Sequence, residues 1–440
     1  MSEARKPPLL IGEIAIDFTI TTSGAENKLR LGGIAHAARG FWAHDVPFAA
    51  AIIVPEYLEA RARDYLVSLG CVDCRIIGRV RGAPNITVIM DATEVAEQGY
   101  DTLLRDEKTV ELTPSAFHVG THDDILIFPG DYDLAAVCAT LPTAAKLHID
   151  AAYNVDDPGT LLALPQKIQT ILTSTSSPFF LGLSDQSLAG VVTAFAQCGA
   201  AATILKENRG GARVASGAEV ISLPAQLGTT VNSVGVGDVF AAAWVTAVND
   251  PPLESGWRAT MAAAAYSQTT FPDLFKNYVQ QSRAVAIDEL VTLGGTALAW
   301  EVRPSYPIYL AAPDFAVGDR AAIDAALASL RYHNFRVRRP VAENGELPRG
   351  ADLAALTSTF AADYTLLKEC ALVFAVPTGR DPGTLVEIGI AIEAGIPVVG
   401  FDPRAENDNT MVIAGAKVYA RDLDICLNAV FDILARKAAS

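Results

Sequence analysis

The sequence has few cysteines and no long apolar run. Six cysteines in 440 residues are too few for a disulfide framework. The motif Cys71-x-x-Cys74 has no second pair at metal-ligand spacing, so we expect no metal site and free, buried thiols in a reducing cytoplasm. Neither a stretch of 18 or more apolar residues nor a secretory signal is visible, which predicts that the chain spans no membrane.

Charged residues are also scarce, and acidic residues outnumber basic ones. They make up 19% of the chain, whereas hydrophobic residues make up 50%, so large cores are easily buried and disorder is not expected. The net charge of −16 repels phosphate backbones, which argues against nucleic acid as a partner. We therefore expect chemistry on small molecules.

Strand-like and helical patterns alternate along the chain, which predicts an α/β fold. A chain of 440 residues exceeds what one hydrophobic core usually supports. The proline-bearing segment Trp300–Pro307 has little periodicity and separates two such series of patterns. We therefore predict a first domain at residues 1–299, a linker at 300–306 and a five-stranded second domain at 307–440.

The second domain contains an acidic pair, Asp381 and Glu387, between the apolar runs 371–376 and 396–401. This strand–helix–strand pattern places the pair where a parallel strand ends and a helix begins, which is where α/β sheets bind ligands. The helix dipole favours an ionised carboxylate there, which suits a nucleophile. Helix capping explains the same residues, because Asp381 is a good N-cap before a proline and Thr384-x-x-Glu387 fits a capping box.

Other side chains fall near the same edge of the predicted sheet. Tyr309 and Phe315 lie at the end of the first strand and in its loop. Asp363 lies on the helix before the run 371–376, and Asn409 lies in the loop after the run 396–401. Because the carboxyl ends of parallel strands meet at one edge, these side chains can converge.

Together these residues resemble the nucleoside 2-deoxyribosyltransferase family, over roughly residues 307–440. The resemblance implies a flavodoxin-like fold with a five-stranded parallel sheet, and an enzyme that exchanges bases on 2'-deoxyribonucleosides. It implies that Glu387 is the nucleophile and that Asp381 or Asp363 protonates the departing base and later takes a proton from the incoming one. Glu387 would attack C1′ through an oxocarbenium-like transition state and give a covalent deoxyribosyl-enzyme.

The resemblance also implies a set of binding residues and an assembly. Tyr309, Phe315 and Gly383 would bind the nucleosides and nucleobases, with Phe315 as a stacking surface. In this family the residue equivalent to Asn409 reaches into a neighbouring subunit's site, which implies a homo-oligomer. The base exchange needs no cofactor.

Two neighbouring activities of the superfamily remain alternatives. With water as the acceptor, the same fold gives an N-glycoside hydrolase. One branch hydrolyses deoxynucleoside 5'-monophosphates and usually has glycine and serine after the first strand. Here the segment Ala311–Asp314 stands there, and Asp314 would repel a phosphate, which favours an unphosphorylated nucleoside.

The first domain contains Gly235-x-Gly237-Asp238 at the start of a small-residue helical run. Backbone N–H groups at such a turn can stabilise an anion, and the aspartate can take the proton of an attacking hydroxyl. With Asp17 on the first strand and a di-glycine that ends at Gly33, the domain resembles the PfkB/ribokinase family of sugar and nucleoside kinases. The resemblance implies a ribokinase-like α/β fold, with ATP and magnesium as cofactors only if the domain is active.

Two departures from that family concern its kinase activity. His36 stands where the family has an asparagine, three residues after the di-glycine. The family's Asn-x-x-Glu, which helps organise magnesium and phosphate, is replaced by the segment Ser174–Pro178. The domain is therefore an active sugar or nucleoside kinase, a kinase of weakened or lost activity, or a non-catalytic module for ligand binding or oligomerisation.

Overall fold

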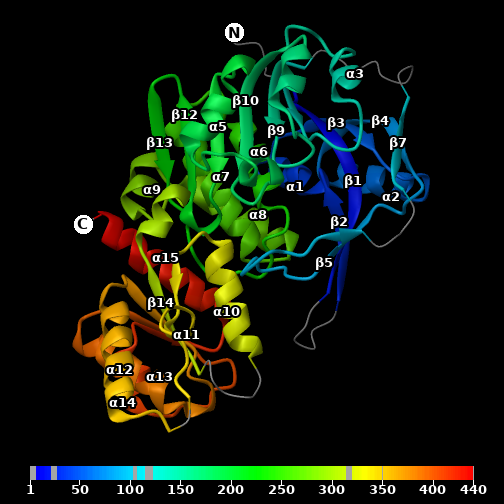
Figure 1. The fold of residues 1–440 in the computed structure, drawn as a ribbon. Helices are drawn as coiled ribbons and strands as arrows, with labels where there is room; N and C mark the ends of the chain where they lie inside the picture. Colours follow the sequence, from blue (N-terminus) through cyan, green and yellow to red (C-terminus); the bar gives the residue numbers. More distant parts are fainter. Residues whose placement is uncertain are drawn as a thin grey trace. The chain divides into compact units, whose positions relative to one another are not determined.

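A computed structural model describes residues 6–20, 27–102, 107–113, 122–313, 320–348 and 350–439. The chain divides into two compact units (Figure 1). Unit 1 comprises Met1–Thr93 and Gln98–Ala297, and unit 2 comprises Leu298–Ser440 with Glu94–Glu97. Both units combine strands and helices, so the predicted α/β class is confirmed.

Unit 1 is built on a 13-stranded sheet within the described residues. Its strands are β1 (Leu9–Thr19), β2 (Lys28–Gly33), β3 (Phe48–Ile53), β4 (Cys71–Arg81), β5 (Ile86–Ile89), β6 (Asp101–Thr102), β7 (Thr109–Leu112), β8 (Asp124–Ile127), β9 (Lys146–Asp150), β10 (Lys167–Ser174), β11 (Ala202–Lys206), β12 (Ala212–Ser216) and β13 (Glu219–Leu223).

The main path of this sheet runs β13-β12-β11-β10-β9-β8-β1-β3-β4-β7. The strands from β11 to β4 along the path are parallel, and antiparallel strands extend the sheet at both edges. β3 reads FAAAII and is buried at every position. Uninterrupted apolar runs of this kind are typical of parallel strands that helices cover on both faces.

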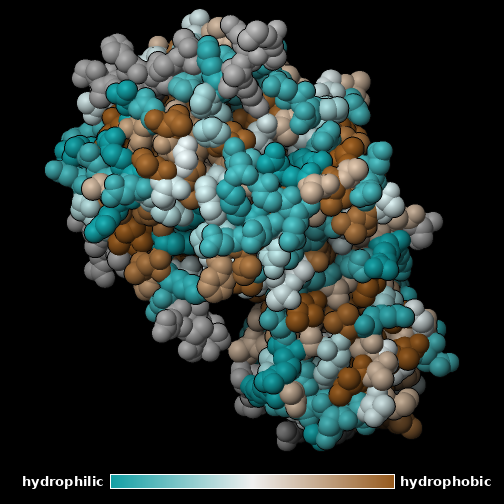
Figure 2. Space-filling view, turned by 180° about the vertical axis from the view of Figure 1, so that it is seen from behind, coloured by the Kyte–Doolittle hydropathy of each residue, from teal (hydrophilic) through white to brown (hydrophobic). Residues whose placement is uncertain are grey.

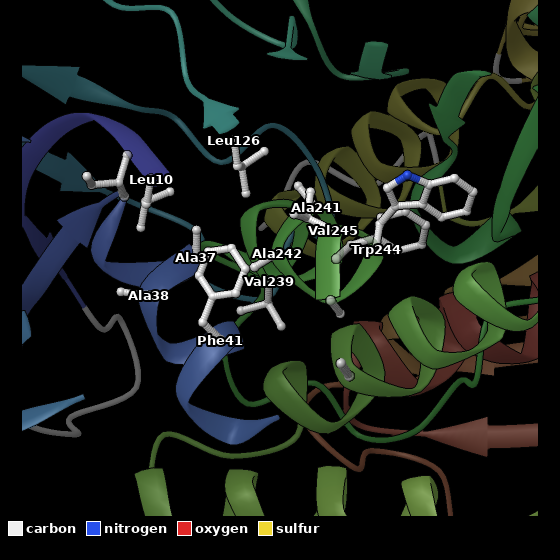
Figure 3. Packing of buried hydrophobic residues seen from close by; sticks show 14 of the residues in the cluster. Leu10, Ala37, Ala38, Phe41, Leu126, Val239, Ala241, Ala242, Trp244 and Val245 are labelled. Atoms are coloured by element: carbon white, nitrogen blue, oxygen red, sulfur yellow. The ribbon is translucent and has the colours of Figure 1, made fainter. Parts of the chain in front are cut away.

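Helices α1 and α6 form much of the core of unit 1 with the central strands. At Gly40 of α1 a Cβ atom would lie 2.8 Å from Cβ of Ala242 in α6, so the glycine permits this close packing. Figure 3 shows Phe41 of α1 with Val239 and Ala242 of α6 in the same cluster. The helices of unit 1 are α1 (Ala35–Ala43), η1 (Glu56–Leu58), α2 (Glu59–Ser68), α3 (Leu134–Cys138), η3 (Pro158–Ala163), α4 (Pro178–Leu181), α5 (Leu188–Ala194), η4 (Ala196–Cys198), η5 (Asn208–Gly210), α6 (Val236–Thr246), α7 (Pro252–Ser267), α8 (Pro272–Ala284) and α9 (Ile287–Leu293).

A small side sheet extends the second half of β1. β2 pairs with it antiparallel, β5 pairs with it parallel, and β6 pairs with β5. The register sets Asp17 of β1 opposite Arg30 of β2. This side sheet therefore carries two of the charged residues of the candidate site in unit 1.

Unit 2 has a five-stranded sheet in the order β15-β14-β16-β17-β18, with every pair parallel. In chain order this is 2-1-3-4-5, which confirms the predicted flavodoxin-like arrangement. Its elements are η6 (Trp300–Ser305), β14 (Ile308–Ala311), α10 (Ala321–Tyr332), β15 (Val337–Arg338), α11 (Pro340–Glu343), α12 (Leu353–Lys368), β16 (Leu372–Ala375), η7 (Thr378–Arg380), α13 (Pro382–Glu393), β17 (Val398–Phe401), α14 (Thr410–Gly415), β18 (Val418–Ala420) and α15 (Leu423–Ala439).

Two helical layers enclose the sheet of unit 2. One core cluster joins buried residues of α12, α13 and α14 to alternate residues of β14 and β16, among them Tyr309. On α15, Phe431 packs its ring against Phe335 and His333, which lie just before β15. Within the described residues, no helix of either unit has both the length and the apolarity to cross a bilayer.

Candidate functional site

The order of the strands in unit 2 reverses between β14 and β16, and α/β sheets bind ligands at such a reversal. β14 brings Tyr309 to this position, and α13, which follows β16, brings Glu387. The hydroxyl of Tyr309 donates a hydrogen bond of 2.6 Å to Oε1 of Glu387. Tyr309 is fully buried, whereas Glu387 is partly exposed. Burial and the nearby charge of Glu387 raise the pKa of Tyr309 far above its usual value, so the hydroxyl keeps its proton and remains a donor.

Asp363 of α12 lies near the same pair. Its negative charge contributes to the raised pKa of Tyr309, after burial and Glu387. The carboxylate is partly exposed, and its Oδ1 accepts a hydrogen bond of 2.7 Å from the side-chain amide of Asn344. The structure therefore places Asp363, Tyr309 and Glu387 in one neighbourhood, from three different elements.

Asp381 is the N-cap of α13. Its Oδ2 accepts hydrogen bonds from the backbone N–H of Thr384 at 2.8 Å and from the Thr384 hydroxyl at 2.9 Å. The capping role predicted for Asp381 is confirmed. The predicted capping box from Thr384 to Glu387 is wrong, because Asp381 caps the helix and Glu387 bonds Tyr309 instead. Gly383 is exposed in the first turn of this helix.

Asn409 lies farther along the same edge, in the loop after β17. Its Oδ1 accepts a hydrogen bond of 2.9 Å from the backbone N–H of Met411, so it caps α14 while remaining exposed. Two residues singled out in the sequence, Asp314 and Phe315, lie outside the described residues.

Sequence reasoning missed Asp402, which follows β17 directly. It is almost fully buried, and its carboxylate accepts hydrogen bonds from the backbone N–H groups of Glu406 and Asn407, each at 3.0 Å. The hydroxyl of Tyr419 donates a third bond of 2.8 Å. Although burial raises the pKa of Asp402, these donors lower it below its usual value. Asp402 therefore holds the loop after β17 as an ionised anchor.

The same loop is bonded to the loop that leads into α13. The side-chain amide of Asn407 donates to the backbone oxygen of Pro377 at 3.1 Å. The carboxylate of Glu406 accepts a hydrogen bond from the N–H of Gly379, and Arg380 donates to the backbone oxygen of Glu406. Asp402 thus fixes, through this loop, the segment just before Asp381. In the sequence, the only signal of this anchoring role is that Asp402 directly follows the apolar run 396–401.

In unit 1, Asp17 and His36 form a buried pair. Oδ2 of Asp17 lies 2.7 Å from Nε2 of His36 and 3.6 Å from Nε of Arg30. Burial alone would raise the pKa of Asp17, but His36 and Arg30 outweigh it and lower the pKa. Burial lowers the pKa of His36 to about 4, so at neutral pH the imidazole is uncharged and its Nε2–H donates to Asp17.

The other ring nitrogen of His36 is an acceptor in this network. The hydroxyl of Tyr266 donates to Nδ1 at 2.7 Å, and Nη1 of Arg39 donates to it at 3.0 Å. Arg39 also donates to the Tyr266 hydroxyl at 3.0 Å. The ring of His36 lies directly against the turn before α6, since a Cβ at Gly235 would lie 2.2 Å from its Cγ.

Asp238 lies in the first turn of α6 and is partly exposed. Burial and the negative charge of Asp150 raise its pKa to about 7. Oδ2 of Asp150, at the end of β9, accepts a hydrogen bond of 2.6 Å from Nζ of Lys206, at the end of β11. A Cβ at Gly237 would lie 3.0 Å from the same ammonium, so Lys206 lies beside the turn.

Gly33 ends β2, with φ near +58°. A Cβ there would lie 2.2 Å from the backbone oxygen of Glu13, so only glycine fits this position. The backbone therefore requires glycine at position 33. At Gly32, a Cβ would lie 2.0 Å from Oδ1 of Asp17, so this glycine leaves room for the carboxylate.

The smaller unit matches a known protein family. Residues 308–423 match nucleoside 2-deoxyribosyltransferase. The family members are enzymes, and this match covers the Tyr309, Asp363, Asp381 and Glu387 positions. No curated protein matches the chain significantly.

Solved structures that resemble the chain include ribokinases and nucleoside kinases. The ribokinase of Thermotoga maritima has 15% identity and a TM-score of 0.44, and the match covers 62% of this chain and 98% of that one. The Arabidopsis thaliana ribokinase, complexed with ribose and ATP, has 14% identity and a TM-score of 0.44, with coverage of 64% and 100%. The Burkholderia thailandensis nucleoside kinase, in complex with inosine, has 12% identity and a TM-score of 0.46, with coverage of 62% and 97%. The chain thus contains a segment, residues 308–423, that matches the nucleoside 2-deoxyribosyltransferase family.

Proposed function

We propose that unit 2 exchanges nucleobases on 2'-deoxyribonucleosides, with Glu387 as the nucleophile. The observation that carries this proposal is the 2.6 Å hydrogen bond from Tyr309 to Glu387 at the reversal point of the sheet. The bond holds one oxygen of a partly exposed carboxylate at the position where ligands of such sheets bind. A carboxylate held in place there is suited to attack a sugar carbon.

The reaction proceeds by double displacement at C1′. The Glu387 carboxylate forms a C1′–O bond while the C1′–N bond to the departing base breaks. The electron pair of that bond goes to the base nitrogen, which takes a proton from Asp363. The acceptor base then returns a proton to Asp363, attacks C1′ and releases the Glu387 carboxylate. Asp363 takes up a proton from water before the first step, and the acceptor base restores this proton in the second, so atoms and protons balance over the cycle.

We assign the proton transfer to Asp363 and a positioning role to Asp381. The charge of Asp363 acts on Tyr309, whose hydroxyl bonds Glu387, so Asp363 lies in the neighbourhood of this pair. Oδ2 of Asp381 already accepts two hydrogen bonds from Thr384. Asp381 therefore holds the start of α13, and with it Glu387, which lies on the next turns of that helix.

The test is base exchange followed by chromatography. The full chain is incubated with a deoxynucleoside, with and without a second free base. New nucleoside that forms only with the second base supports the transferase, whereas free base and sugar released without it indicate an N-glycoside hydrolase. Glu387→Gln should abolish both reactions, and turnover that survives this change would show that the nucleophile is another group.

A second substrate tests the role of Asp363. Nicotinamide 2'-deoxyriboside releases a neutral base that needs no proton, so its first step does not require an acid. Asp363→Asn should lose turnover of ordinary deoxynucleosides but still release nicotinamide. Equal losses on both substrates would assign Asp363 a different role.

We also propose that the protein is a homo-oligomer that associates through α12, α13 and α14. These helices expose large apolar side chains, with Leu353 and Met411 each 79% exposed. Among the others, Leu356, Phe360, Tyr364 and Val386 complete a set of six. Apolar residues also reach the surface elsewhere, as on the face in Figure 2, but these six lie on three helices that pack on one side of one sheet.

The partner that fits this face best is a second copy of the chain. A net charge of −16 makes copies repel one another over most of their surface, whereas α14 has no charged residue and α12 has only Asp363 and Lys368. The six side chains expose on the order of 600 Å² per copy, so a symmetric contact buries about 1,200 Å², the lower end of stable interfaces. Light scattering should give at least a dimer. Phe360→Glu should give a monomer, while Leu293→Glu on α9 should not; a monomeric wild-type protein would contradict the proposal.

A further inference from the structure

The loop after β10 in unit 1 contains no group suited to magnesium. The Ser174 and Ser176 hydroxyls lie 2.9 Å apart, and the Thr173 and Ser177 hydroxyls lie 3.2 Å apart. Ser177 also accepts the N–H of Phe180 and caps α4. Magnesium prefers carboxylate and phosphate oxygens, whereas the side chains of this loop offer only hydroxyls. Four of them are bonded in pairs, and the hydroxyl of Thr175 is buried without a partner. Among the described residues, no group of three or more His, Cys, Asp or Glu side chains is arranged to hold a metal ion.

The cations near the turn before α6 are already paired. Lys206 donates to Asp150 at 2.6 Å. Arg30 donates to the Asn232 side chain at 2.8 Å and to the backbone oxygen of Val234 at 2.7 Å, and it lies 3.6 Å from Asp17. Three carboxylates, those of Asp17, Asp150 and Asp238, act on one another through their charges. Arg30, Arg39 and Lys206 only equal these three carboxylates in number, so the turn offers a triphosphate no net positive charge.

His36 occupies the remaining side of that turn. Its ring packs on Gly235 and is fixed on both nitrogens by Asp17, Tyr266 and Arg39. Oδ2 of Asp17 is therefore used within the unit, as the partner of a buried imidazole.

We propose that unit 1 neither binds magnesium ATP nor transfers phosphate, and that the residues at its kinase-like positions have become a structural network centred on Asp17 and His36. Magnesium and ATP, which the family resemblance implies for an active domain, do not fit the residues present. This proposal does not depend on the base exchange proposed for unit 2, because every residue that carries it lies in unit 1.

The experiment uses the full chain and two independent measurements. The first measures ADP release and the melting temperature with 5 mM magnesium ATP, with and without ribose or adenosine. We expect neither ADP above the protein-free blank nor an increase in melting temperature. ADP release that Asp238→Asn abolishes, or clear stabilisation by magnesium ATP, would overturn the proposal. ADP release that persists in the Asp238→Asn variant does not come from the kinase-like site, and this result would agree with the proposal.

The second measurement tests the structural role of the network. Asp17→Asn leaves the buried ring of His36 without its anionic partner, so we expect the melting temperature to fall by about 4 °C or more. His36→Asn should lower it similarly. Asp238→Asn is the matched control, since Asp238 lies at the same site but outside this network, and it should not lower the melting temperature. An unchanged or higher melting temperature for Asp17→Asn would refute the structural role.

Discussion

The hydrogen bond between Tyr309 and Glu387 offers the most direct test of the proposed nucleophile. Tyr309→Phe removes only the hydroxyl. The ring stays within β14 and its core cluster, which includes Val373 and Ile388, so the fold should be preserved. Glu387 is partly exposed and can replace the lost donor with water, so the melting temperature should change little.

The expected loss of rate follows from the strength of the bond. A hydrogen bond to a charged group contributes about 1.5–3 kcal/mol. Because each 1.36 kcal/mol corresponds to a factor of ten, formation of the deoxyribosyl-enzyme should slow by about 10- to 150-fold. The loss should appear in the first chemical step, since the hydroxyl orients the attacking carboxylate. The substrate's binding constant should change much less.

Single-turnover experiments separate these quantities. Enzyme in excess over a deoxynucleoside gives the rate of base release, and its dependence on enzyme concentration gives the binding constant. Tyr364→Phe is the matched control, because it removes a hydroxyl from an exposed tyrosine of the same unit. If Tyr309→Phe stays within about twofold of the wild type, or if the control loses as much, the hydrogen bond does not orient the nucleophile.

Three further predictions concern the carboxylates. The pKa of Asp238, raised to about 7, means that its ionisation costs stability as the pH rises from about 4 to about 7. The full shift corresponds to about 4 kcal/mol, and solvent screening reduces it by roughly half. Asp238→Asn should therefore raise the melting temperature at pH 8 and leave it unchanged at pH 4; equal effects at both pH values would refute this. Asp402→Asn should lower both the melting temperature and the exchange rate at pH 7. The difference in stability between the wild type and Asp402→Asn should become smaller below pH 4. The pKa of Asp402 is lowered in the folded protein, so its contribution to stability disappears once the carboxylate is protonated. Asp381→Ala should cost about 1 kcal/mol through loss of the N-cap, and Asp381→Asn should recover most of it; equal melting temperatures of the two variants would contradict the capping role.

The outline of unit 2 could be predicted because its signals are local. Short apolar runs, a capped helix start and the rule for parallel strands were enough to predict that Tyr309, Asp363 and Glu387 lie close together. The partner of Glu387 could not be predicted in the same way. A glutamate in the first turns of a helix is compatible with a capping box and equally with a contact to a distant strand. In the folded unit, Glu387 bonds Tyr309 of β14, 78 positions earlier in the chain.

In unit 1 the decisive contacts join distant parts of the chain. His36 bonds Tyr266, 230 positions later, and Arg30 bonds Asn232, 202 positions later. No local pattern marks Tyr266 or Arg39 as partners of the imidazole. In the side sheet, β2 and β6 were not predicted, because β2 is short and half polar and β6 has only two residues. Motif resemblance identified Asp17 and Asp238 but could not show which of the two is bonded within the unit.

The order of the strands in unit 1 has a consequence for synthesis on the ribosome. β1 lies between β3 and β8, and Leu9 pairs with Ile125. At roughly 5–20 residues per second, β8 emerges on the order of 10 s after β1. During that interval residues 9–11 of β1 have only β3 beside them, which exposes this apolar edge to pairing with other nascent chains. The strands of unit 2 lie much closer together in the chain, so their sheet can close soon after translation ends. Aggregation during expression should therefore arise from unit 1 and should decrease when translation is slowed or a chaperone is supplied.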